Sequence, residues 1–222
     1  MSASSEIRLV RYNPHNDAEG LTDALIQCYR EVFGEDPWNE WKKCQVCGRK
    51  WGKQELTSDD DHHHCGMLLV DFWPEEIVRA DLLHEITAEA SCRLALDGNK
   101  VIGFCWGYPI SPIELEQKLG ITELAEALTR EFGALERVAY QDELGVLSMY
   151  RGKKLARQLF THRLKDFLEK GLSVGVIRTK TNPPSVTYLW FTGKLGYKLI
   201  AEYKDEDGRV VLAKSFAELF MD

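Results

Sequence analysis

Residues 140–171 read YQDELGVLSMYRGKKLARQLFTHRLKDFLEKG, and they predict a strand, a basic turn and a helix. Leu144 and Val146 are alternate apolar positions, which is typical of a strand that packs one face on a core. From Gly152 onward the apolar residues recur with helical spacing instead. Gly171 supplies the expected stop at the C-terminal end of this helix.

The expected helix has two different sides. Its apolar side consists of Leu155, Leu159, Phe160, Leu164, Phe167 and Leu168. The opposite side is largely charged and consists of Arg157, Arg163, Lys165 and Glu169. We therefore expect the apolar side to face the core and the charged side, Arg163 included, to face water.

The turn between strand and helix is basic. Arg151, Lys153, Lys154 and Arg157 lie where the first unpaired N–H groups of the helix point outward. Backbone donors, helix dipole and side-chain charge all favour an anion at this place, and a phosphate is the obvious ligand. The alternative is a basic helix start that only faces water. The chain has a net charge of −7, so this positive cluster runs against its own composition.

Three other phosphate or nucleophile motifs do not fit this stretch. The motif G-x-x-x-x-G-K-[ST] fails because Gly145 and Gly152 have the wrong separation and Lys153 is followed by Lys154. G-x-G-x-x-G also fails, as does a G-x-S-x-G nucleophile elbow around Ser148. A different kind of phosphate-binding turn is therefore needed.

Residues 146–159, VLSMYRGKKLARQL, resemble the acetyl-CoA-binding segment of the GNAT superfamily of N-acetyltransferases, [QR]-x-x-G-x-[GA]. Arg151 and Ala156 match this pattern, whereas Lys154 stands where the family usually has glycine. The resemblance implies an α/β (α+β) fold with a mixed, mostly antiparallel central sheet flanked by helices. It also implies transfer of an acetyl group from acetyl-CoA to a primary amine by direct attack in a ternary complex.

The resemblance extends from about residue 5 to residue 216, interrupted by residues 42–67. Residues 194–197, KLGY, are similar to the helix-ending K-x-G-[FY] segment, and Asn182 to the asparagine that contacts the cofactor. Four residues before Gly196, the glycine of this segment, the family often has a tyrosine that acts as the general acid. This chain has Thr192 at that position. Tyr188, one helical turn earlier, is the expected substitute.

The resemblance implies three roles for residues around the basic turn. The pyrophosphate would be held, chiefly by backbone N–H groups, at Arg151, Gly152, Lys153, Lys154, Leu155, Ala156 and Arg157. An ammonium must lose a proton before it attacks a thioester, and Glu143 is the expected base, with a solvent-facing carboxylate as the alternative. A backbone N–H near Val146 or Leu147 would polarise the thioester carbonyl.

A second pattern occupies residues 44–66, CQVCGRKWGKQELTSDDDHHHCG. Its two ends have the same form, a pair of metal-ligand residues separated by two positions and followed by glycine. Such a pair makes a tight turn whose amides face a metal-bound sulfur. We expect structural zinc on Cys44, Cys47, His62 and Cys65, with His63 or His64 as the substitute histidine.

The alternatives for these cysteines are free thiols beside a polar loop or a redox pair of Cys44 and Cys47. A redox pair should follow a strand and open a helix, and this context is absent from the pattern. The other cysteines, Cys28, Cys92 and Cys105, lie in apolar patterns, which is unlike a secreted disulfide framework. Zinc held by four protein ligands would have no open position and would be structural.

Length and composition predict an ordinary globular chain. Its 222 residues, 44% hydrophobic and 28% charged, suit one acetyltransferase-like domain over 1–222 with a zinc-ribbon-like insert at 42–67. We find no apolar run of the ~20 residues needed to cross a bilayer and no signal core at the N-terminus. We therefore expect a cytoplasmic protein, without a membrane partner, that is a monomer or a homodimer.

The acidic balance bears on partners. It argues against nucleic-acid binding and favours a cationic acceptor, the amine of a small molecule or a peptide. A rival interpretation is a catalytically weak or inactive protein of this fold that uses its zinc ribbon as a protein-docking module. Lys154 and Thr192, which depart from the family pattern, favour this rival.

The remaining elements follow from periodicity and turn residues. Strands are expected at 6–12, in a hairpin over 91–110, and at 172–178, 197–203 and 209–216. Helices are expected at about 19–33, 111–132 and 185–195. Ser111, Pro112 and Glu114 have the spacing of an N-cap, a first-turn proline and a capping-box glutamate.

Overall fold

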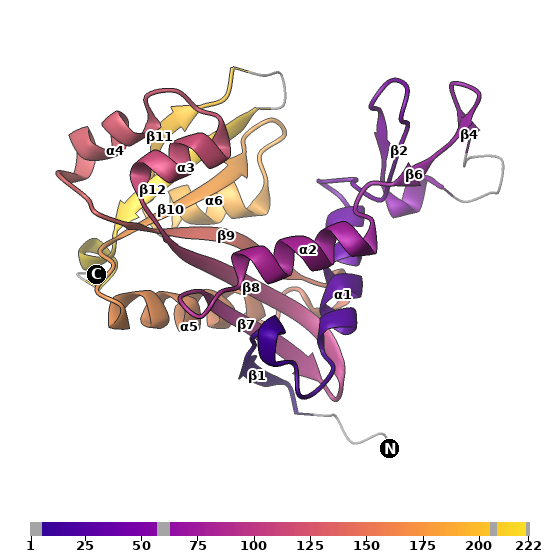
Figure 1. The fold of residues 1–222 in the computed structure, drawn as a ribbon, viewed down its shortest axis with the longest axis horizontal. Helices are drawn as coiled ribbons and strands as arrows, with labels where there is room; N and C mark the ends of the chain where they lie inside the picture. Colours follow the sequence, from indigo (N-terminus) through magenta and orange to yellow (C-terminus); the bar gives the residue numbers. More distant parts are fainter. Residues whose placement is uncertain (1–5, 57–62, 205–207, 221–222) are drawn as a thin grey trace. The chain divides into compact units, whose positions relative to one another are not determined.

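The computed structural model describes residues 6–56, 63–204 and 208–220 (Figure 1). Within these residues a seven-stranded sheet has the order β1-β7-β8-β9-β10-β12-β11. β9 and β10 are parallel, whereas β1 with β7, β10 with β12, and β11 with β12 are antiparallel. This confirms the predicted α/β fold with a mixed, mostly antiparallel sheet.

Contacts divide the chain into two compact units. The first contains the described residues of 1–88, 92–105 and 144–160, and the second those of 89–91, 106–143 and 161–222. Four elements, β7, β8, β9 and α5, contribute residues to both units. The basic turn belongs to the first unit, and Glu143 belongs to the second.

The first unit holds two helices and most of the short strands. In chain order its elements are β1 (Arg8–Arg11), α1 (Thr22–Gly34), β2 (Lys42–Lys43), β3 (Lys50–Trp51), β4 (His63–His64), β5 (Met67–Leu68), β6 (Val70–Asp71), α2 (Glu75–Glu85) and β7 (Ser91–Asp97). The helix α1 begins later than expected because the carboxylate of Asp17 accepts hydrogen bonds from the amides of Leu21 and Thr22, both at 2.8 Å. Figure 1 shows β2, β4 and β6 at one end of α1 and α2.

The rest of the chain alternates strands with helices. Its elements are β8 (Lys100–Ile110), α3 (Pro112–Leu119), α4 (Leu124–Phe132), β9 (Val138–Val146), α5 (Leu155–Glu169), β10 (Val174–Lys180), α6 (Val186–Gly193), β11 (Lys198–Glu202) and β12 (Arg209–Ser215). β9 begins before the predicted alternation of Leu144 and Val146, because the apolar run from Val138 to Tyr140 is fully buried.

The capping box predicted at the start of α3 is present. The Ser111 hydroxyl accepts from the Glu114 amide at 3.2 Å, and the Glu114 carboxylate accepts from the Ser111 amide at 3.1 Å. The helical region expected at 111–132 is also present, and it consists of two helices, α3 and α4. Gly120, with φ 66°, ends α3 in the left-handed conformation that glycine favours.

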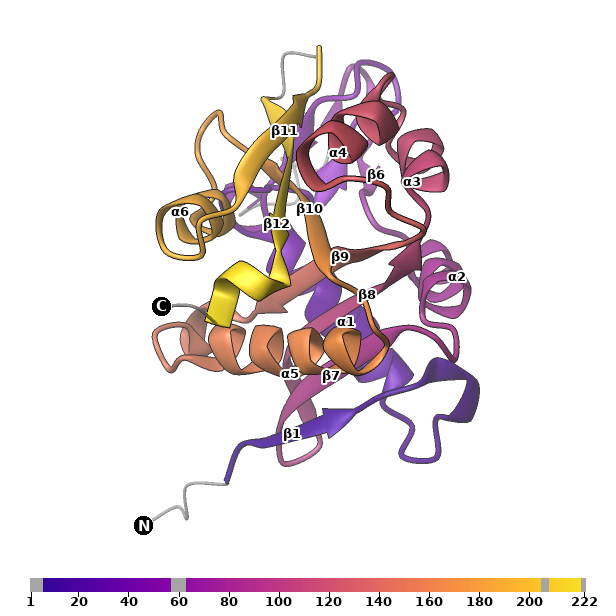
Figure 2. The same cartoon turned by 90° about the vertical axis from the view of Figure 1, so that its left-hand side faces the viewer.

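The core of the second unit lies between α3, α4 and one face of the strands. It consists of Leu115, Leu119, Ile121, Leu124, Leu128, Val138, Tyr140, Val174, Val176, Val211 and Ala213. Figure 2 shows α6 on the other side of β10 and β12 from α3 and α4. These strands are therefore covered on both faces, as their apolar runs predict.

The helix α5 confirms the predicted apolar side except for Leu168, which is 38% exposed near the C-terminal end of the helix, and it corrects one residue of the charged side. Arg163 is 1% exposed and is among the largest fully buried side chains. Its guanidinium donates to the carbonyl oxygens of Trp106 and Glu143. Burial is possible because these acceptors replace water, and sequence periodicity contains no signal for them.

None of the helices in the described ranges combines the length and the apolar composition that crossing a membrane requires.

Gly107 of β8 provides a test of the packing between β8 and β9. A Cβ there would overlap the Tyr140 carbonyl oxygen and lie 3.0 Å from the Gln141 Cα. Because both neighbours are backbone, we expect Gly107→Ala to lower the free energy of unfolding by about 2 kcal/mol or more. Gly193→Ala, which meets nothing within 4 Å at the end of α6, is the control. Urea denaturation compares them, and equal midpoints would contradict the close approach.

Candidate functional site

The turn that follows β9 is shaped by Arg151. Its Nε donates to the Val146 carbonyl oxygen at 3.1 Å, and its Nη2 lies 3.4 Å from the Glu35 carboxylate. The guanidinium therefore folds back onto the end of β9 and onto the residue after α1. Arg151 fixes the path of the turn, in addition to any charge that it contributes.

Backbone amides collect on the exposed side of this turn. Residues 151–154 are exposed, and α5 begins at Leu155. Within the described chain, the amides of residues 152–157 have no protein acceptor. The first backbone contact of the helix is the Gln158 amide, which donates to the Lys154 carbonyl at 3.1 Å. An exposed helix start with free N–H groups is suited to bind a phosphate.

Lys154 occupies the position where the family usually has glycine. Its φ is 63°, in the left-handed region that glycine adopts freely and that costs another residue about 1–2 kcal/mol. Gly152, with φ 78°, is also left-handed. The backbone of the turn thus keeps a conformation that favours glycine, and the lysine side chain adds a positive charge at its surface.

Neighbouring side chains of the first unit support the turn. The Tyr150 hydroxyl donates to Asp97 at 2.7 Å, and Lys153 Nζ lies 4.8 Å from the centroid of the Tyr150 ring. The hydrogen bond to Asp97 raises the pKa of Tyr150. The Ser148 hydroxyl donates to Glu35 at 3.0 Å. The turn is therefore anchored on both sides of its exposed amides.

The two amides proposed to polarise the thioester differ. The Leu147 amide donates to the Ile102 carbonyl at 3.0 Å, which engages its hydrogen in the protein. Val146 is the last residue of β9 and accepts from Arg151 through its carbonyl. Of the two amides, that of Val146 is therefore the candidate for polarising the thioester carbonyl.

Glu143 and Asp142 place two carboxylates on β9 in the second unit. Glu143 is partly buried. Asp142 has a side chain that is 5% exposed, and it accepts from the Tyr108 hydroxyl at 3.0 Å and lies 3.6 Å from Lys118 Nζ. The carboxylate of Asp142 is therefore paired with side chains from β8 and α3. Sequence reasoning missed this pair because its partners come from distant elements.

Two further side chains of the second unit, Tyr140 and Arg178, interact with these carboxylates. Burial, and next the Asp142 carboxylate, raises the pKa of Tyr140 well above its usual value. Burial acts to lower the pKa of Arg178, but Tyr140 and Glu143 outweigh it and raise that pKa. Within the described residues the buried hydroxyls of Tyr140 and Tyr203 have no hydrogen-bond partner. Tyr140 is part of the core of this unit and Tyr203 packs against it, and buried hydroxyls of this kind are commonly satisfied by ordered water.

The residues predicted around α6 also lie in the second unit. Asn182 is exposed in the loop before α6, and the Tyr188 amide donates to the Ser185 hydroxyl at 3.0 Å in the N-cap of this helix. The Thr192 hydroxyl donates to the Tyr188 carbonyl at 2.7 Å. Its proton is therefore engaged within the helix, whereas Tyr188 is partly exposed.

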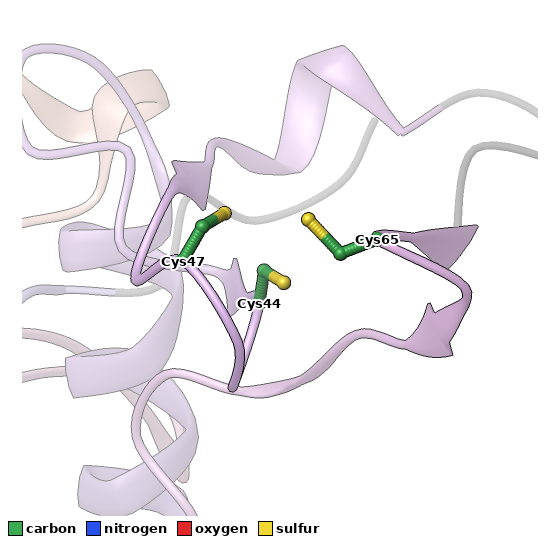
Figure 3. A group of neighbouring side chains, drawn as sticks. All are labelled: Cys44, Cys47 and Cys65. Carbon is green, nitrogen blue, oxygen red and sulfur yellow. The ribbon is translucent and has the colours of Figure 1, made fainter.

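Three of the predicted metal ligands come together. The sulfur atoms of Cys44, Cys47 and Cys65 all lie within 4.8 Å of one another. Figure 3 shows the three side chains converging from two separate loops. Tetrahedral zinc with Zn–S bonds of 2.3 Å separates its sulfurs by about 3.8 Å, so the cluster fits this ion after a small adjustment.

The backbone around the cysteines has the expected tight-turn form. The Gly48 amide donates to the Cys44 carbonyl at 3.0 Å, and both Gly48 and Gly66 have φ 72°. Hydrogen bonding from the Cys47 amide lowers the pKa of the Cys44 thiol. Amides that stabilise a thiolate in this way also suit a metal-bound sulfur.

The structure gives different information on each of the three candidate histidines. His62, the predicted ligand, lies outside the described residues. The backbone of His63 pairs with Leu68 in the hairpin of β4 and β5. The His64 ring packs against Trp51, with ring centroids 4.9 Å apart at an angle of 65°. The His64 ring is therefore engaged in an aromatic contact with Trp51.

Comparison with known proteins identifies the family. The model of the acetyltransferase (GNAT) family matches residues 19–189. A comparison with curated proteins gives no sequence match.

Several solved structures share the fold. The polyamine N-acetyltransferase of Drosophila melanogaster, which forms N-acetylagmatine, has 16% identity and a TM-score of 0.62, with 95% of this chain and 100% of that chain covered. PaiA N-acetyltransferase of Thermoplasma acidophilum in complex with coenzyme A has 14% identity, a TM-score of 0.55 and coverage of 95% and 99%. NAA60 of Arabidopsis thaliana in complex with acetyl-CoA has 12% identity, a TM-score of 0.55 and coverage of 96% and 99%.

The family model spans well over half of the chain, and the sheet and the turn before α5 agree with it. This protein therefore belongs to the acetyltransferase (GNAT) family.

Proposed function

We propose that the protein transfers an acetyl group from acetyl-CoA to a primary amine of a small molecule or peptide. The observation that carries this proposal is the exposed turn at the start of α5, where the amides of residues 152–157 have no protein acceptor. Relatives of the same fold have been solved with coenzyme A and with acetyl-CoA. Others are named for the acetylation of polyamine, agmatine or arylalkylamine.

The turn would hold the pyrophosphate of acetyl-CoA in two ways. The backbone amides from Gly152 to Ala156 would donate hydrogen bonds, while Lys153, Lys154 and Arg157 would add positive charge. Arg151 would act mainly by shaping the turn through its contacts with β9 and Glu35. Asn182 is proposed to contact the cosubstrate, as the resemblance implies.

The acetyl transfer itself would use side chains of β9 and α6. Acetyl-CoA supplies a thioester that an uncharged amine can attack. Glu143 would take the proton of the ammonium, directly or through water. The amine nitrogen would then bond to the acetyl carbon, the C–S bond would break, and the coenzyme A sulfur would take a proton from Tyr188. The second proton of the former amine nitrogen would pass, directly or through water, to the Tyr188 phenolate, which leaves a neutral amide. Thr192 is the less suited donor because its hydroxyl is already engaged.

Electrostatic support would come from the end of β9. The Val146 amide is proposed to donate to the carbonyl oxygen of the thioester, where negative charge develops during attack. On the acceptor side, the partly buried carboxylate of Glu143 offers a polar contact for an amine. The negative charge of the whole chain favours the approach of a cationic acceptor.

We also propose that Cys44, Cys47 and Cys65 hold a structural zinc ion. The convergence of three sulfurs within 4.8 Å, on tight turns with amides near Cys44, supports this site. His62 remains the predicted fourth ligand. The ion would tie the segment around β2 and β3 to the segment around β4 and β5, and it would take no part in acetyl transfer.

Substitutions of Lys154 test whether the turn binds the phosphates of acetyl-CoA. We expect Lys154→Glu to weaken acetyl-CoA binding about tenfold or more, because a charge-assisted contact becomes a repulsion. Lys154→Gly should change the affinity by less than about threefold, because glycine keeps the left-handed turn and its amides. Lys165→Glu is the matched control, because Lys165 is exposed on α5, the helix that follows Lys154. Calorimetric titration measures all three, and equal effects at 154 and 165 would remove the site from the turn.

Activity and the base are tested together by thiol release from acetyl-CoA across a panel of amines. With the best amine, we expect Glu143→Gln to lower kcat by about 10²–10⁴-fold, because the ammonium then loses its proton only to water. The wild-type kcat/KM should rise with pH through the pKa of the base, and the variant should lose this rise. Glu169→Gln, exposed on α5, is the control. Binding of acetyl-CoA without turnover of any amine would oppose the enzymatic proposal.

Metal removal tests the cysteine cluster. We expect elemental analysis to find about one zinc ion per chain, and a strong chelator to lower the melting temperature, because zinc stabilises only the folded site. Cys47→Ser should lose the zinc, whereas Gln45→Ser in the same loop should keep it. A chain that contains no zinc and whose melting temperature ignores the chelator would refute the site.

A further inference from the structure

Arg163 is a buried cation in the middle of α5, and its side chain reaches two strands. It is 1% exposed. Nη1 donates to the carbonyl oxygens of Trp106 at 2.9 Å and Glu143 at 2.7 Å, and Nη2 donates to the Gln141 side-chain oxygen at 3.1 Å. Removing a guanidinium from water is costly unless such donors are satisfied. One side chain of α5 therefore holds the backbones of β8 and β9 together.

Gln141 extends this network away from α5. Its amide nitrogen donates to the Tyr197 hydroxyl at 2.8 Å, and both residues are 3% exposed. Gly175 leaves room for the contact, because a Cβ there would lie 2.6 Å from the Gln141 nitrogen. Burial raises the pKa of Tyr197, so its phenol stays neutral near physiological pH. The network is therefore closely packed and does not change its charge in that range.

The network lies where β9 stops pairing with its parallel neighbour. Among the described residues, β9 pairs with β10 at Ala139↔Gly175 and Tyr140↔Val176. The next residue, Gln141, contacts Arg163 and Tyr197 instead. Two residues further on, the carbonyl of Glu143 is again held by Arg163. The guanidinium thus takes over from the strand ladder in fixing this part of β9.

We infer that Arg163 is a positioning residue for the proposed base: it holds the backbone of Glu143 and thereby fixes the direction in which the carboxylate leaves β9. This inference rests on the proposed function, in which Glu143 takes the proton of the amine. A shift of about 1 Å at a reacting group can cost about 10²-fold in rate. Lysine in place of arginine keeps the charge but loses the planar fork that reaches several acceptors at once.

The first experiment compares Arg163→Lys with the wild type, using the full chain, acetyl-CoA and the best amine of the panel. We expect kcat to fall about 10- to 100-fold while the Kd of acetyl-CoA changes by less than about twofold. Arg130→Lys is the matched control, because Arg130 is exposed on α4 and pairs only with Glu126 among the described residues. An unchanged kcat in folded Arg163→Lys would overturn the inference.

A double-mutant cycle separates positioning from general structural support. If Arg163 acts through Glu143, Arg163→Lys should lower kcat by less than about threefold in the Glu143→Gln background. Independent effects that multiply would overturn the inference, because Arg163 would then act by another route. If Glu143→Gln alone leaves kcat unchanged, the base assignment fails and the positioning role fails with it. If only Arg163→Lys leaves kcat unchanged, the base assignment stands.

A second variant serves if Arg163→Lys does not fold. Gln141→Met removes one acceptor of the guanidinium and leaves both backbone carbonyls in place. We expect a fall in kcat of about three- to tenfold that disappears in the Glu143→Gln background. A fall of the same size in both backgrounds, or no fall in a folded Gln141→Met protein, would overturn the inference.

Discussion

The hydrogen bonds from the Arg163 guanidinium to two strand carbonyls constrain the centre of this fold. They join α5 to β8 and β9 at a level where β9 no longer pairs with β10. The same helix begins at Leu155, next to the amides proposed to grip acetyl-CoA. One helix therefore begins at the turn proposed to bind phosphate and also carries the residue that holds the backbone of the proposed base. Repacking α5 would affect both functions.

The elements that were predictable from sequence carry their signals locally. Ser111 and Glu114 form the capping box that their spacing predicts, and Gly171 follows α5 with φ 74°. The burial of Arg163 was not predictable, because its acceptors are backbone carbonyls brought close only by the fold. The division of α3 from α4 was equally hidden, since Gly120 lies within a pattern that remains helical on both sides.

The candidate site was predictable to a similar extent. The repeated cysteine motif indicated the cluster of Cys44, Cys47 and Cys65. Four basic residues in a short turn predicted phosphate binding there, and this assignment stays a prediction. Local sequence could not reveal that the Leu147 amide is engaged by Ile102, or that Lys154 adopts a left-handed conformation. That conformation removes one argument for an inactive docking protein, because the turn retains a backbone geometry suited to glycine.

The cysteine-bearing segment begins and ends at one place within the first unit. Lys43 pairs with Val70, and Lys42 pairs with Asp71, so the chain returns beside its own point of departure. Such adjacent ends mean that the intervening stretch could be excised and closed by a short turn without moving α1 or α2. A module attached in this way can be gained, lost or exchanged among homologues while the remainder of the protein keeps its architecture.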